Sequence, residues 1–230
     1  MKIGIFGDSF ASLKFEENPT PTWVDILSTK YNITNHALPG SNLYYSIKLI
    51  QETHLEYDEI ILIVTEPGRI KTAKWLPLEG SEQFVVGLLD SYINNTTIDK
   101  FTGNKKLAYE AARQYFVYLQ DSEFDNFIQE LMLENILKSK HNIIMIPSFL
   151  SSWHNNSCNS MHQIFLKENK GWGINEEDRI ENDIRNCHMT AENNEIFAKK
   201  AEKWLNGKTV HINLDDFVTT TNKDFYLKQK

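Results

Sequence analysis

A serine near the start of the chain has neighbours that favour nucleophilic chemistry. Residues 3–6 form a short apolar run that predicts a buried strand, and Gly7 after them predicts a tight turn. Ser9 would then stand just past the carboxyl end of a strand, where open α/β sheets bind their ligands. Its hydroxyl can attack a carbonyl carbon when a general base reaches it. Glycine, aspartate and serine are also ordinary turn residues, so this stretch alone is compatible with a plain strand-to-loop turn.

The best candidate for that base is His188, one of seven histidines. It stands immediately before the last predicted helix, and its imidazole can take the serine proton. Asp183 could accept the other imidazole proton and stabilise the imidazolium as it forms. A single loop histidine can also be only a surface or capping residue, and that alternative stays open.

The other histidines give weaker signals. His36 follows an apolar run and is compatible with a buried residue whose polar atoms have partners. His154 and His162 flank an irregular stretch and could contact a substrate or have no role. No pair of histidines has a metal-ligand spacing with a convincing third donor. We therefore expect no metal and no cofactor.

Strand and helix signals alternate along the chain, which predicts a parallel sheet covered on both faces. The predicted strands cover residues 3–6, 31–37, 59–64, 142–146 and 209–212. Two predicted helices begin at Thr20–Pro21 and at Ser41, and two more cover residues 107–118 and 124–138. The last predicted helix is capped by Thr190 and stopped by Gly207. Residues 65–106 and 148–182 are predicted to be irregular insertions in a single domain, 1–230.

Composition narrows the class of protein. The chain has 230 residues, of which 41% are hydrophobic, enough for one large α/β domain. A formal net charge of -7 argues against a nucleic-acid-binding surface. Nothing resembles a membrane span, and Gly4, Gly7 and Asp8 interrupt the first apolar run before a signal peptide could form. Cys158 and Cys187 have neither metal-ligand nor redox spacing, so we expect synthesis in the cytoplasm. Export by another route and packaging into a virion stay open.

Taken together, these short blocks resemble the SGNH (GDSL-type) hydrolase superfamily, over nearly the whole chain. The resembling residues, in chain order, are Gly7-Asp8-Ser9-Phe10, Gly40 after the second strand, and His188 before the last helix. A second block is more narrowly similar to SGNH-like proteins encoded by phages and bacterial polysaccharide loci. It comprises the arrangement Asp-x-Arg-x-x-His-Met-Thr over residues 183–190, followed by Glu192, Asn193 and Asn194.

The resemblance implies a flavodoxin-like three-layer α/β/α sandwich with a central parallel sheet, the SGNH hydrolase fold. It also implies a serine esterase in which Ser9 is the nucleophile, His188 the base and Gly40 an oxyanion donor. The expected substrate is a small ester, in particular an O-acetyl group on a carbohydrate. Aromatic residues in the insertions could stack on sugar rings, although any one of them is more commonly a core residue. These are Trp75, Tyr92, Trp153 and Trp172.

Two departures from the family pattern bear on activity. The third family block is Gly-x-Asn-Asp, whereas residues 64–69 here read Val-Thr-Glu-Pro-Gly-Arg, and the ionised side chain of Glu66 can only accept hydrogen bonds. In the family, the asparagine of this block is a side-chain hydrogen-bond donor to the oxyanion, and the resemblance leaves that donor missing here. Arg69 or Asn42 could supply it. Arg69 is favoured because it is a cation, although it could instead form a surface salt bridge. The family aspartate precedes the histidine by three residues, and this chain has Arg185 at that position. Asp183 instead stands five residues before His188.

Two other functions remain open on the sequence. The same residues could transfer an acetyl group to a glycan, because water and a sugar hydroxyl compete for one acyl-enzyme. The chain could also be a non-catalytic glycan-binding or structural protein of a phage particle, as a homo-oligomer or within a virion assembly. A nucleotide or flavin binder is disfavoured, since the first turn has no Gly-x-Gly-x-x-Gly fingerprint.

Overall fold

The computed structural model describes residues 1–12, 21–39, 41–65, 122–138, 142–148, 159–168, 189–207 and 210–218, together with 107, 110 and 114. At its centre is a four-stranded sheet in the order β2-β1-β3-β4, in which all three neighbouring pairs are parallel. The strands are β1 (Lys2–Phe6), β2 (Asn32–Asn35), β3 (Glu59–Val64) and β4 (Ile143–Pro147). The predicted α/β class with a central parallel sheet is thereby confirmed.

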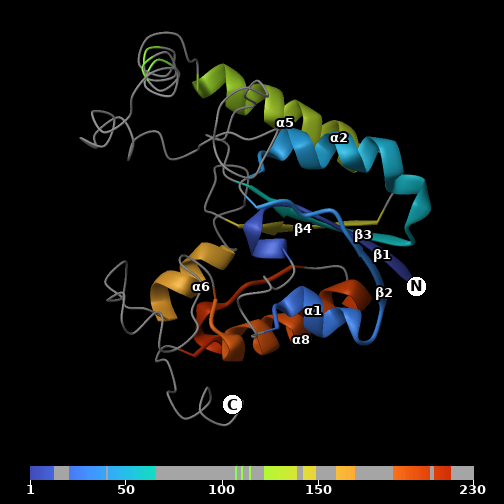
Figure 1. Ribbon diagram of the computed structural model, residues 1–230, viewed down its shortest axis with the longest axis vertical. Coiled ribbons are helices and arrows are strands. Elements are labelled where there is room, and N and C mark those ends of the chain that lie inside the picture. Colours follow the sequence, from blue (N-terminus) through green and yellow to red (C-terminus); the bar gives the residue numbers. More distant parts are fainter. Residues whose placement is uncertain are drawn as a thin grey trace.

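Helices cover both faces of the sheet (Figure 1). The first layer contains α1 (Trp23–Ser28), α6 (Met161–Glu168) and α8 (Ala191–Gly207). The second layer contains α2 (Leu43–Thr53) and α5 (Ser122–Lys138). Of the helices in the described part of the chain, none combines the length and apolarity needed to cross a membrane.

Alternation along the strands separates two hydrophobic cores. Ile3 and Ile5 of β1 pack into the first-layer core, whereas Phe6 packs into the second. This is the period of two that a strand imposes on its side chains. All six residues of β3 are buried, as expected of a strand between two neighbours and under helices on both faces.

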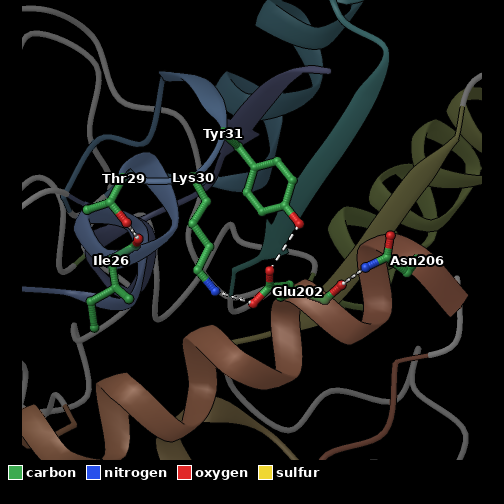
Figure 2. A network of polar contacts seen from close by, with 6 residues as sticks. All are labelled: Ile26, Thr29, Lys30, Tyr31, Glu202 and Asn206. Atoms are coloured by element: carbon green, nitrogen blue, oxygen red, sulfur yellow. Dashed lines mark hydrogen bonds and ion pairs between the residues drawn. The ribbon is translucent and has the colours of Figure 1, made fainter.

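Polar contacts join the segment between α1 and β2 to α8 (Figure 2). The Lys30 ammonium donates to the Glu202 carboxylate at 2.8 Å, and the Tyr31 hydroxyl donates to the same carboxylate at 3.3 Å. The hydrogen bond from Lys30 holds the pKa of the Glu202 carboxyl below its usual range. The Lys30 side chain is 56% exposed and that of Glu202 30% exposed, so water screens this ion pair and it contributes little stability.

Both early helices begin later than predicted. Thr22, not Thr20, is the N-cap of α1, because Thr22 and Asp25 form a capping box in which each side chain accepts the other's backbone N–H. Asn42, not Ser41, is the N-cap of α2, since its side-chain oxygen accepts the amide of Tyr45 at 2.9 Å.

The later part of the chain holds further differences. Helix α6 lies inside the stretch 148–182 that was predicted to be irregular. Residues 210–213 do not form the predicted last strand in the part of the chain that the structure describes. The helices predicted over 124–138 and after Thr190 are confirmed, and α8 ends at Gly207 as expected. Most of the insertion 65–106, and of 148–182, lies outside the described residues.

Candidate active site

The candidate site lies at the carboxyl ends of the two central strands. The chain leaves β1 toward α1 in the first layer and continues to β2, whereas β3 and β4 lie on the other side of β1. The strand order therefore reverses between β1 and β3, and ligands of open α/β sheets bind outside such a point. Phe6 pairs with Leu62, so the turn after β1 begins beside the end of β3.

Gly7 lets the turn lie directly against β3. Its φ is 150°, and a Cβ built on it would stand 2.5 Å from the Cβ of Ile63. The Gly7 carbonyl accepts hydrogen bonds from the Leu38 amide and the Ser41 hydroxyl, both at 2.9 Å. The turn after β1 is therefore fixed between β3 and the loop that follows β2.

Ser9 begins a short 3-10 turn, η1 (Ser9–Ala11), directly after this glycine. Asp8 is wholly buried, and its carboxylate accepts the Phe10 amide at 3.0 Å as the N-cap of the turn. The Ser9 carbonyl accepts the backbone amide of Ser12 at 3.3 Å and its hydroxyl at 2.9 Å. Ser9 itself is only partly buried, so the turn leaves part of this residue exposed just past the carboxyl end of β1, where the sequence predicted it.

A buried tryptophan connects this turn to the start of α8. The Trp23 indole N–H donates to the Phe10 carbonyl at 2.7 Å, and its backbone N–H donates to the Asn194 side chain at 2.9 Å. The Asn194 amide in turn donates to the carbonyls of Met189 at 3.0 Å and Thr190 at 2.9 Å. Three successive contacts thus join the residue after Ser9 to the residue after His188.

Of the six predicted site residues, Ser9 and Asn42 lie in the described part of the chain. Asn42 is 1% exposed, and its Oδ1 is committed to capping α2, which fixes the orientation of the amide. His188, Asp183, Gly40 and Arg69 lie outside the described residues. Residues next to two of them can be placed: Met189 is tied to the serine turn through Asn194, and Ser41 donates to Gly7.

The neighbouring asparagine also has a structural role that the sequence pattern did not reveal. The Asn193 side chain accepts the Val218 amide at 2.9 Å and donates to the Val218 carbonyl at 3.1 Å. Asn193 therefore holds the segment after η4 (Leu214–Asp216) against α8, while Asn194 holds α1. The sequence signal that could have predicted these contacts is the pair of adjacent asparagines in the first turn of a helix, since such side chains commonly bond to backbone groups.

Two partly buried histidines lie near the carboxyl ends of outer strands, His36 directly after β2 and His162 beside the residue that follows β4. His36 Nε2 lies 2.6 Å from the Tyr57 hydroxyl, and its ring stacks on Phe6 with centroids 4.8 Å apart. Burial lowers the pKa of His36, as expected of a packed residue with a polar partner. His162, the second residue of α6, donates its backbone amide to the Ser148 carbonyl after β4 at 2.8 Å, and burial lowers the pKa of its imidazole.

The lowered pKa of His36 predicts a loss of stability in mild acid. An unfolded histidine titrates near pH 6.5, so below that pH the unfolded chain takes up protons that folded His36 resists. The free energy of unfolding should therefore fall as the pH drops from about 6.5 toward the folded pKa. Urea titrations from pH 7.5 to 5 would measure this, with a shallower pH slope expected for His36→Phe. An equal slope in both proteins would contradict the assignment.

Comparison with models of known protein families gave no match, and comparison with curated proteins gave none either. The candidate site is therefore characterised by its own geometry: a partly exposed serine at the sheet's reversal point, fixed by Gly7 and joined to the start of α8 by Trp23 and Asn194.

Proposed function

We propose that this protein is a serine esterase in which Ser9 is the nucleophile, His188 the general base and Asp183 the group that orients the histidine. The observation that carries this proposal is the bridge from Phe10 through Trp23 and Asn194 to Met189. It fixes the neighbours of the proposed nucleophile and base relative to one another.

The proposed reaction proceeds through an acyl-enzyme. The Ser9 oxygen attacks the ester carbonyl carbon as its proton passes to His188. The bond from that carbon to the alkoxy oxygen then breaks, and the leaving alcohol takes the proton from the imidazolium. Water repeats the sequence on the acyl group, with His188 as base, and releases the acid and free Ser9. If a sugar hydroxyl replaces water, the same intermediate gives acetyl transfer.

The developing negative charge on the carbonyl oxygen needs fixed hydrogen-bond donors. We propose the backbone amides of Ser9 and Gly40, with Arg69 or the Nδ2 group of Asn42 as a side-chain donor. The position of Ser41 against the Gly7 carbonyl supports the placement of this loop beside the serine turn. Removal of one such donor typically costs about 2.7–4 kcal/mol of transition-state stabilisation.

The finer fold assignment belongs to the same proposal. The strand order β2-β1-β3-β4 with helices on both faces supports a flavodoxin-like, SGNH-type sandwich. For the substrate we propose a small O-acetyl ester on a carbohydrate.

Labelling with a fluorophosphonate probe tests the activated serine. The wild-type protein should react at Ser9, and His188→Ala should react at least about 10²-fold more slowly, because general-base catalysis contributes about that much. The probe-bearing peptide, identified by mass spectrometry after digestion, should contain Ser9. A folded wild-type protein that does not react would favour the non-catalytic binding or structural alternative.

A further inference from the structure

Thr65 stands at the same reversal point of the sheet as Ser9. It follows the last residue of β3 and is 1% exposed. Ile61 and Ile63 of β3 pack into the first-layer core, whereas Leu62 and Val64 pack into the second. Alternation therefore places Thr65 on the first-layer side, the side into which Phe10 of the serine turn also packs.

The Thr65 hydroxyl is buried without a hydrogen-bond partner among the described residues. Its counterpart after β4 behaves differently, because the Ser148 hydroxyl donates to the Val64 carbonyl at 2.9 Å. A buried hydroxyl with no partner is destabilising, and valine would fill almost the same volume without that cost. A buried polar group of this kind needs an explanation, and its position beside the ligand-binding edge provides one.

We infer that the Thr65 hydroxyl is a hydrogen-bond donor to the carbonyl oxygen of the bound ester, and to the oxyanion that forms from it. This inference rests on the proposed esterase function. A hydroxyl carries one rotatable donor, so it can turn toward the negative charge when the tetrahedral intermediate forms. Thr65 would thereby supply a side-chain donor at the end of β3, the strand beside the serine turn.

The rate of fluorophosphonate labelling tests this role, because the phosphonyl oxygen of the product occupies the position of the oxyanion. Thr65→Val should label roughly 10²–10³-fold more slowly than wild type, the loss typical of one oxyanion donor. Its midpoint of urea unfolding should not fall, since only an unpaired hydroxyl is removed. Thr65→Ser, which keeps the donor, should recover most of the rate.

A matched control exists across the sheet. The Ser46 hydroxyl on α2 is also buried without a partner among the described residues, but this residue lies on the second-layer side. Ser46→Ala removes the same kind of group and should label at the wild-type rate.

The outcomes separate this inference from the function on which it rests. If wild type labels and Thr65→Val labels equally fast, the role of Thr65 is overturned and the esterase proposal stands. A Thr65→Val protein that labels slowly but has also lost stability likewise overturns the role, because the hydroxyl would then have a structural partner. If folded wild type does not label at all, the proposed function itself fails, and the inference with it.

Discussion

Ester hydrolysis by the Ser9→Ala protein is expected to be at least about 10⁴-fold slower than by wild type, because the nucleophile of an acyl-enzyme mechanism cannot be replaced by a methyl group. Hydrolysis of p-nitrophenyl acetate, followed by the release of p-nitrophenol, provides the measurement. The effect should appear in kcat, since the hydroxyl acts mainly in the chemical step. The methyl group of alanine fits wherever the serine side chain fits, so the fold should be unchanged.

Ser28→Ala is the matched control for this substitution. Ser28 is exposed at the end of α1, and its hydroxyl donates to the Asp25 carbonyl at 2.7 Å. We expect its activity to equal that of wild type. Equal activity in Ser9→Ala as well would show that the hydrolysis does not use Ser9, and would remove the basis of the proposed function.

Gly7→Ala is expected to lower the free energy of unfolding by about 3 kcal/mol. Two costs combine: a side chain at a φ of 150° is strained, and its Cβ would stand 2.5 Å from that of Ile63. Ile63 is fully buried in the central strand and cannot move aside without disturbing the first-layer core. Urea unfolding at neutral pH measures the change.

Gly207→Ala is the control for Gly7→Ala, because it makes the same substitution at a glycine whose surroundings are open. Gly207 is the last residue of α8, and a Cβ built there meets nothing within 4 Å. Alanine at that site should leave the free energy of unfolding unchanged or raise it by a few tenths of a kcal/mol, because it restricts the unfolded chain. A Gly7→Ala protein as stable as Gly207→Ala would mean that the turn after β1 can lie farther from β3.

The sheet could be predicted from the sequence because its signals are local. The apolar runs that became β1, β3 and β4 are short, dense and bounded by turn residues, and each lies where it was expected. The position of Ser9 past the end of β1 follows from those signals alone. Helix starts were less predictable, since both Thr20 and Thr22, or both Ser41 and Asn42, could cap, and only the folded backbone selects one.

The contacts that fix the site are not local and could not be predicted in the same way. Trp23 and Asn194 lie 171 residues apart in the chain, and the residues flanking each of them do not predict that the Trp23 amide donates to the Asn194 side chain. A tryptophan at a helix start and two adjacent asparagines at another are each compatible with many partners. The orphan hydroxyl of Thr65 likewise becomes informative only when its burial and its lack of a partner among the described residues are known. From the sequence, residues 64–66 indicated only that the asparagine of the third family block is absent.

Trapping of the acyl-enzyme tests the central claim most directly. Wild-type protein mixed with excess p-nitrophenyl acetate and quenched in acid within the first turnovers should gain the mass of one acetyl group. Digestion should place that group on the peptide containing Ser9, and Ser9→Ala should gain none. An acetyl group on another residue, or rapid hydrolysis with no acetylated protein at any quench time, would contradict an acyl-enzyme on Ser9.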